Sequence, residues 1–164
     1  MEWKLSILLL LTLLTAYRVI LRVLQARSAG NPTPESVADV YDAETYQRWK
    51  RYCAESCRVE LIFAVISCLA SLALLATGAY AAFAALFPPS LEFFPVILLE
   101  SLVGFLLESV KSYVSTMVIE EKYGFNRSTK KTFIFDKIRG FIVEMIISLG
   151  LSTLLWLLYT ALGD

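Results

Sequence analysis

Residues 105–144 read FLLESVKSYVSTMVIEEKYGFNRSTKKTFIFDKIRGFIVE, and they are the most informative part of the sequence. An apolar helix runs to Ile119 and ends in the charged residues Glu-Glu-Lys. Gly124 follows, and glycine readily adopts the positive φ that terminates a helix. Ser128-Thr129 can cap what comes next, a basic amphipathic run that leads into another apolar stretch. The pattern predicts two membrane-spanning helices joined by a polar turn.

The composition of the whole chain agrees with a membrane protein. Of its 164 residues, 57% are hydrophobic and 18% charged, against about 45–50% and about 25% in soluble domains. Mean hydropathy is +0.64. A soluble domain of this length cannot bury so much apolar surface, because small domains leave much of their surface exposed. Lys and Arg number 15, as do Asp and Glu, so the zero net charge gives no support for nucleic-acid binding.

The sequence contains no histidine, and this removes several kinds of catalytic site. A His-based triad, a His proton shuttle and a His-ligated zinc site are all excluded. Cys53, Cys57 and Cys68 lack the spacing of a disulfide framework. Cys53 and Cys57, at i and i+4, read either as small apolar residues or as acylation sites. We expect no proteolytic activity and no stoichiometric zinc in this chain, since a closed zinc site needs four ligands.

Four apolar stretches are long enough to cross a hydrocarbon core of about 30 Å, which takes about 20 helical residues. They cover about residues 3–22, 60–87, 94–119 and 138–162. Pro88-Pro89 ends the second stretch. The predicted fold is therefore all-α, a single membrane domain over residues 1–164 built as a multi-pass bundle of four transmembrane helices. A cytoplasmic helical segment lies between the first two.

The positive charges predict the orientation of the bundle. Two polar segments, 25–58 and 120–137, separate the spans on one side. Eleven Lys and Arg residues lie in them or at the start of the last span, against Lys4 on the other side. The positive-inside rule places both segments in the cytoplasm and both termini opposite. The host membrane would be that of the ER in a eukaryote, and the inner or plasma membrane in a prokaryote.

The segment between the first two spans carries helix signals of its own. Residues 33–35, Thr-Pro-Glu, are typical of a helix start. Asp42 can cap a second helix that runs into the second span. Apolar side chains recur along that helix at Tyr46, Trp49, Tyr52 and Cys53. This aromatic stripe indicates either a helix lying at the headgroup level or one that docks onto another domain.

Polar residues also form a stripe along the third span. Glu100, Gly104, Glu108, Lys111 and Ser115 fall within about 80° on a helical wheel. Each charge at the bilayer centre costs about 2.5–3.5 kcal/mol, so this stripe cannot face lipid. It faces either a neighbouring helix or a water-filled cavity.

Two motifs resemble those of a known family. IEEKYGFNRST, followed by F-x-x-D-K-I-R, resembles the signature of the type I CAAX prenyl endopeptidases, integral-membrane zinc metallopeptidases of the ER and of bacterial membranes. Upstream, Pro34-x-x-Val37-x-x-Val40-x-Asp42-x-x-x-Tyr46 is similar to the N-terminal region of the same family. The resemblance covers nearly the whole chain.

The resemblance implies a protein with seven membrane helices around a water-filled chamber. The family holds its zinc with an H-E-x-x-H helix and a later Glu, all downstream of the fourth span. None of these residues is in this chain, which is similar to the non-catalytic N-terminal membrane domain, with the catalytic domain outside it. Membrane lipid and a C-terminal protease domain would be its partners. Zinc and prenylated protein or peptide substrates would belong only to the full-length enzyme.

The resemblance also assigns roles to two sets of residues. The stripe becomes a candidate chamber wall, formed by Glu100, Glu108, Lys111 and Ser115. The polar turn becomes a candidate docking motif for the protease domain, formed by Glu120, Glu121, Lys122, Tyr123, Gly124, Phe125 and Asn126. Without the remaining helices the stripe would face lipid, which favours a homo-oligomer of the isolated domain.

Two other functions compete with this hypothesis. One is a stand-alone four-helix membrane scaffold or regulatory protein. The other is a small transporter that uses the stripe. The transporter has less support, because neither an inverted repeat nor a pair of broken helices marks a binding site.

Overall fold

The computed structural model describes residues 2–28, 31, 42–91 and 93–162, and every element within them is helical. The all-α prediction is confirmed. The helix start expected at 33–35 and most of the motif at 34–46 lie outside the described residues. In chain order the elements are α1 (Glu2–Ser28), α2 (Ala43–Thr77), α3 (Ala79–Ala84), the 3₁₀ helix η2 (Pro89–Leu91), α4 (Phe93–Tyr113), the π-helix η3 (Val114–Glu120), α5 (Glu121–Tyr123) and α6 (Lys130–Leu162).

Three of the described helices are long and apolar enough to cross a membrane by length and composition. They are α1 from Lys4 onward, α2 and α6. Helix α4 does not join them, because it carries Glu100, Glu108 and Lys111 within 21 residues. The count of four spans, with α4 as the third, stays a prediction.

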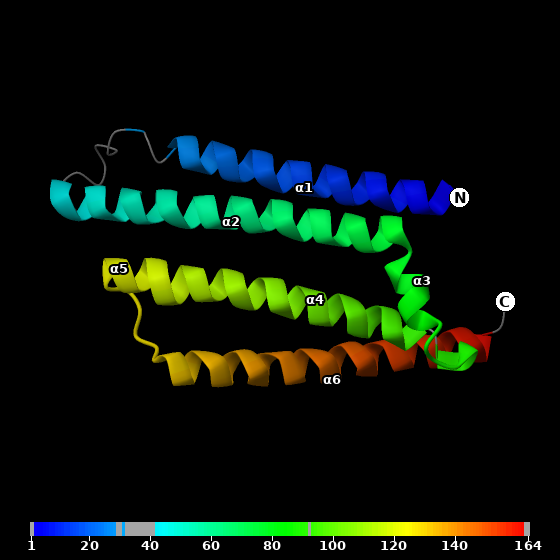
Figure 1. Cartoon of the computed structure of the whole chain (residues 1–164). Helices are drawn as coiled ribbons and strands as arrows, with labels where there is room; N and C mark the ends of the chain where they lie inside the picture. The colour runs from blue at the N-terminus through cyan, green and yellow to red at the C-terminus, as the bar shows by residue number, and fades with distance from the viewer. Residues whose placement is uncertain (1, 29–30, 32–41, 92, 163–164) are drawn as a thin grey trace. The chain divides into compact units, whose positions relative to one another are not determined.

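The chain divides into two compact units. Unit 1 holds residues 1–73 and 110–127, and unit 2 holds residues 74–109 and 128–164. In unit 1, α1 and α2 run side by side in opposite directions (Figure 1). Arg22 of α1 forms an ion pair with Glu60 of α2, 2.7 Å between Nη2 and Oε2. These residues end the first predicted span and begin the second, so the ion pair joins the two span ends on the same side.

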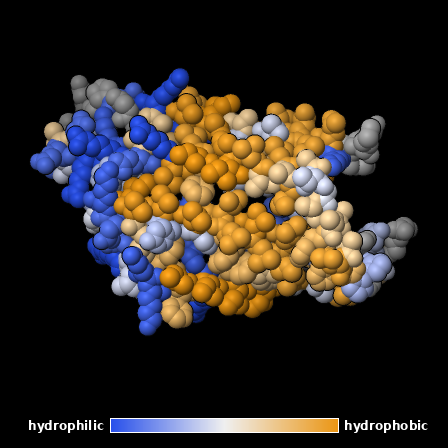
Figure 2. All heavy atoms as spheres, in the orientation of Figure 1, coloured by the Kyte–Doolittle hydropathy of each residue, from blue (hydrophilic) through white to orange (hydrophobic). Residues whose placement is uncertain are grey.

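The start of α2 has the expected N-cap. The backbone N–H of Thr45 donates to Asp42 Oδ1 at 2.8 Å, and the Thr45 hydroxyl donates to Oδ2 at 2.6 Å. These two donors stabilise the carboxylate and lower the pKa of Asp42. The capped helix continues without interruption to Thr77, so the expectation that it runs into the second span is confirmed. Hydrophilic residues gather at the end of unit 1 that holds the start of α2 and α5 (Figure 2).

The second predicted span, 60–87, differs from the single uninterrupted helix that we expected. Helix α2 stops at Thr77, and Gly78 adopts φ 75° and ψ 19°, the left-handed conformation. The short α3 follows and ends before Pro88. Glycine permits this break because it has no Cβ to clash with the backbone. An isolated glycine in an apolar run is usually tolerated within a helix, so Gly78 by itself did not predict this break.

Unit 2 is built around α4 and α6. Pro95 lies in the first turn of α4, where a missing N–H costs no hydrogen bond, and it is fully buried. The rings of Phe105 in α4 and Phe141 in α6 pack 4.3 Å apart between centroids. The Tyr80 hydroxyl of α3 donates a hydrogen bond to the carboxylate of Glu100.

Candidate functional site

The polar turn after η3 and α5 is a helix C-cap. Gly124 has φ 76°, and its N–H donates to the carbonyl of Glu121 at 3.1 Å. The N–H of Phe125 donates to the carbonyl of Glu120 at 2.8 Å. This pair of bonds is the Schellman arrangement, in which two otherwise unpaired carbonyls of the last helical turn are satisfied. The predicted role of Gly124 is confirmed.

The helical turns before this cap have a wider bonding pattern than expected. Residues 114–120 form the π-helix η3, and Ile119 within it is only 5% exposed. The sequence predicts helix here, but nothing in residue spacing predicts i→i+5 bonding. π-helical turns within α-helices are rare and occur frequently at functional sites.

The turn is bound to the N-terminal half of α2 through Glu55. Lys122 Nζ lies 2.5 Å from Glu55 Oε1, and the Tyr123 hydroxyl donates to the same oxygen at 3.1 Å. The hydrogen bond from Lys122 lowers the pKa of Glu55, and the bond to Glu55 raises the pKa of Lys122. Burial and the Glu55 charge raise the pKa of Tyr123, which keeps its phenol protonated as the donor. One carboxylate therefore binds two successive residues of the turn.

Two further residues of α2 contact the same turn. Arg48 Nη2 donates to the backbone carbonyl of Tyr123 at 2.6 Å. The Tyr52 ring packs edge-on against Tyr123 and Phe125, with centroids 5.6 and 5.0 Å apart. Tyr123 itself is only 7% exposed, whereas Phe125 is 50% exposed. Tyr123 is thus the buried anchor of the turn, and half of the Phe125 side chain stays accessible.

Sequence reasoning missed Arg48 and Glu55 as residues that hold the turn, and it singled out Tyr52 only as a member of the aromatic stripe. Arg48, Tyr52 and Glu55 lie at i, i+4 and i+7, which places them on one face of a helix. That spacing was a usable signal for a contact face. The segment that this face contacts could not be predicted, because Glu55 and Lys122 are 67 residues apart in sequence.

The two acids of the motif, Glu120 and Glu121, have different surroundings from the paired Glu55. Glu121 Oε2 accepts a hydrogen bond from Asn126 Nδ2 at 2.8 Å, within the turn. Lys122, the nearest base, pairs with Glu55 instead. In the described part of the chain, neither Glu120 nor Glu121 forms an ion pair.

An open aromatic pocket lies between α2 and the turn. Its volume is about 660 Å³. Tyr46 and Trp49, two members of the predicted aromatic stripe, form one side, and their rings stack 5.6 Å apart. The described lining residues are Thr45, Tyr46, Arg48, Trp49, Tyr123, Gly124 and Phe125. The stripe and the predicted docking motif thus meet around one cavity, although the sequence separates them by about 75 residues.

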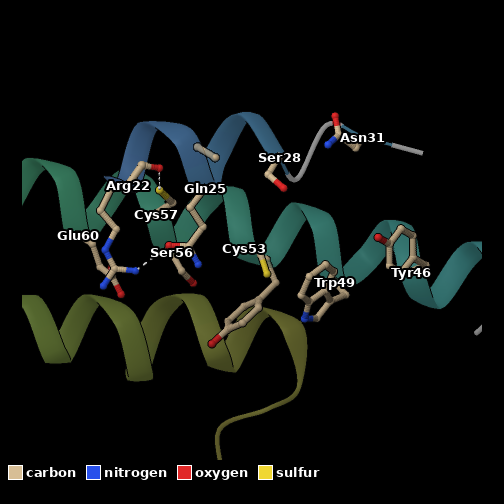
Figure 3. A pocket seen from close by; sticks show the side chains of 12 residues that line it. Arg22, Gln25, Ser28, Asn31, Tyr46, Trp49, Cys53, Ser56, Cys57 and Glu60 are labelled. Carbon is tan, nitrogen blue, oxygen red and sulfur yellow. Dashed lines mark hydrogen bonds and ion pairs between the residues drawn. The ribbon is translucent and has the colours of Figure 1, made fainter. Parts of the chain in front are cut away.

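A smaller pocket of about 350 Å³ lies between the end of α1 and α2 (Figure 3). The Cys57 thiol is buried there and donates to the carbonyl of Arg22 at 3.3 Å. Burial and the neighbouring Cys57 raise the pKa of Cys53, which lowers its thiolate fraction at neutral pH. Among the residues that the structure describes, no group of three His, Cys, Asp or Glu side chains is placed to hold a metal ion.

The polar stripe lies along α4 and η3. Glu100 and Glu108 are exposed, and Lys111 and Ser115 are half-buried. Glu100 accepts the hydrogen bond from Tyr80 described above, a partner that the sequence did not indicate. These residues remain candidates for a chamber wall.

Long apolar helices joined by polar turns define this chain as a multi-helix membrane domain. Over residues 20–164 the sequence matches the family described as the CAAX prenyl protease N-terminal region with five membrane helices. The chain therefore belongs to that family, and the resemblance seen in the EEKYGFN motif is confirmed. The family description gives five membrane helices, one more than the four predicted spans. No curated protein and no solved structure matches the chain.

Proposed function

We propose that this chain is the non-catalytic membrane domain of a CAAX prenyl protease-like zinc metalloendopeptidase. It anchors the enzyme in the membrane, contributes a wall of the chamber and offers a docking surface for the protease domain. The zinc ligands and the reaction on prenylated substrates belong to that other domain. The observation that carries the proposal is the EEKYGFN turn, held rigidly on α2 with part of its surface left open.

The docking role is supported by the difference in burial between Tyr123 and Phe125 within the turn. Tyr123 is buried, and Glu55, Arg48 and Tyr52 fix its position. Phe125, the next residue but one, is half exposed. A pre-positioned aromatic side chain is suited to insertion into a partner's pocket, because little conformational freedom is lost on binding. Glu120 and Glu121 are then available to basic residues of the protease domain.

The chamber-wall role rests on the cost of charge in lipid. Glu100, Glu108 and Lys111 lie on one side of an otherwise uncharged helix. A water-filled chamber removes the penalty of about 2.5–3.5 kcal/mol that each charge would incur at the bilayer centre. The hydrogen bond from the Tyr80 hydroxyl also stabilises the Glu100 carboxylate.

The coding sequence downstream of codon 164 provides the first test. An in-frame H-E-x-x-H motif supports the proposal. A stop codon there, in a genome without a separate protease-domain gene of this kind, favours the scaffold or regulatory protein.

Substitutions provide the second test, in the protein that carries both domains. Glu120→Gln with Glu121→Gln, and separately Phe125→Ala, should each lower proteolytic activity while membrane insertion stays normal. Phe135→Ala is the matched control. It removes an exposed phenylalanine from the same predicted cytoplasmic segment but outside the turn. Unchanged activity and stability in the turn variants would reject the docking role.

We also propose that residues 25–58 and 120–137 face the cytoplasm and that both termini lie on the opposite side. The excess of Lys and Arg in these two segments supports this orientation. A reporter fused after Asp164 should read as non-cytoplasmic. A cytoplasmic signal from that fusion would contradict the orientation.

A further inference from the structure

The aromatic pocket has features that the proposed docking role does not use. Trp49 is 47% exposed on its rim, and Tyr46 stacks behind it. Neither residue belongs to the EEKYGFN turn. The volume of about 660 Å³ falls within the range of about 300–1,000 Å³ that is usual for ligand pockets. Aromatic walls of this kind bind apolar side chains favourably, because aromatic rings bury a large apolar area.

The charge of the pocket selects for an acidic occupant. Arg48 contributes the only charged side chain among the described lining residues. A guanidinium has five N–H donors, so its single bond to the Tyr123 carbonyl leaves others for a carboxylate. Arg51 lines the adjoining pocket on the other side of Arg48, together with Glu44 and with Lys122, which is paired with Glu55. An acidic group placed beside the aromatic walls would therefore meet donors in a fork geometry suited to it.

The position of the pocket along α2 excludes a lipid headgroup. Glu60 is the last charged residue of α2, so the hydrocarbon core begins beyond it. Trp49 lies eleven residues earlier, which is about 16 Å along a helix that rises about 1.5 Å per residue. The headgroup layer is only about 5–8 Å thick on each side of the hydrocarbon core. A helix tilt of about 20° shortens the projection by only a few per cent. The pocket therefore lies in water, beyond the lipid surface.

We propose that this pocket binds a soluble protein segment in which a bulky apolar side chain stands next to a carboxylate. The apolar side chain enters between Trp49 and Phe125, and the carboxylate pairs with Arg48. The inference rests on the proposed docking function and names the chemistry of the partner at that site. It adds the N-terminal half of α2 to the docking surface.

Fluorescent peptides test this specificity on the full chain in nanodiscs. Three probes share one backbone, with a central Asp-Phe-Glu, Asp-Ala-Glu or Lys-Phe-Lys. Fluorescence polarisation should show saturable binding of the first peptide. Binding of the other two should be at least about tenfold weaker, since one lacks the apolar side chain and the other the carboxylates. Equal binding of all three peptides, or no binding of the first, would overturn the proposal.

Two variants of the chain locate the site. Trp49→Ala should weaken the first peptide at least about tenfold, and Trp49→Phe should restore most of the affinity. Gln47→Ala is the control, because Gln47 lines the adjoining pocket and not this one. Trp49→Ala with unchanged affinity would show that the peptide binds elsewhere and would reject the site.

The same variants separate this inference from the proposed function. Loss of proteolytic activity in Phe125→Ala, together with unchanged activity and peptide affinity in Trp49→Ala, keeps the docking turn and rejects the pocket. Loss of peptide binding in Trp49→Ala, together with full activity in the Glu120→Gln and Glu121→Gln variants, keeps the pocket and rejects the turn as the docking element.

Discussion

Different kinds of contact stabilise the polar end of unit 1 and, separately, the helix pair of unit 2. In unit 1, directional contacts join α2 to the turn: an ion pair, hydrogen bonds from Tyr123 and Arg48, and three packed aromatic rings. In unit 2, the contacts between α4 and α6 include the apolar ring pair Phe105 and Phe141, and the Tyr80 hydroxyl donates to Glu100 nearby.

This difference is the one that the proposed placement predicts, with the turn in water and the α4–α6 pair in lipid. Lipid is as apolar as leucine, so helices within it associate by close packing and not by a hydrophobic driving force. Beyond the lipid, water competes for every polar contact, and several must act together to hold a turn in place. A rigid polar turn with an open rim suits recognition by another domain. An apolar helix pair with a polar stripe suits the wall of a chamber.

Water accessibility along α4 should give the largest effect. In a variant without Cys53, Cys57 and Cys68, single cysteines at Glu100 and Glu108 should react with a small charged thiol reagent in the protein that carries both domains. Cysteines at Leu102, Leu106 and Val110 should react several-fold more slowly, because a thiolate does not form in hydrocarbon. Labelling confined to the three apolar positions would reject the chamber wall.

Replacement of the turn glycine should have the next largest effect. Gly124→Ala should destabilise the turn by about 1–2 kcal/mol, the cost of a left-handed conformation for a residue with a Cβ. The new Cβ would lie 3.5 Å from Arg48 Nη2, an ordinary contact, so the penalty comes from the backbone.

Gly140→Ala is the control for this substitution. Gly140 lies inside α6 with open space around it, and alanine there should be neutral or stabilising by about 0.5–1 kcal/mol. Thermal unfolding in detergent measures both variants. An equal response at the two glycines would contradict the role of the left-handed cap.

The ring pair of unit 2 should give a smaller effect. A double-mutant cycle with Phe105→Leu and Phe141→Leu should yield a coupling energy of about 0.5–1.5 kcal/mol, the usual value of an aromatic pair beyond its buried area. Chemical unfolding of the four proteins gives this energy. Strict additivity of the two substitutions would mean that the rings contribute area only.

The response of the turn to pH should be the smallest effect near neutrality. The Glu55 pKa is lowered from its usual 4.5, so its stabilising contact is present above that pH and is lost as pH falls through the lowered pKa. The Lys122 pKa is raised from its usual 10.5, so its contribution is present below that pH and is lost as pH rises through the raised value. The contact should therefore hold unchanged between about pH 5 and 10.

Fluorinated tyrosine at position 123 reports this contact by ¹⁹F NMR. Its resonance should shift at a midpoint below pH 4.5 in the parent chain. Glu55→Gln should abolish that acid transition. A transition that persists in Glu55→Gln would assign the shift to another group.

Helix caps and helix ends could be predicted from the sequence wherever a single residue type favours one local backbone conformation. Asp42 was readable as a cap because its side chain bonds an amide three residues later. Gly124 was readable as a helix end because only glycine adopts positive φ without strain. The break at Gly78 was not readable, since the same residue type is often accommodated inside a helix.

The helical membrane domain, its family and the residues of the EEKYGFN turn could all be predicted from the sequence alone. Helical periodicity and long apolar runs are local properties, so they can be read along the chain. The three-dimensional arrangement was needed to show that Glu55, Arg48 and Tyr52 hold the turn, and that the aromatic stripe and the turn share one pocket. Such contacts join side chains about 70 residues apart, and their pairing depends on how α2 and the turn meet in space.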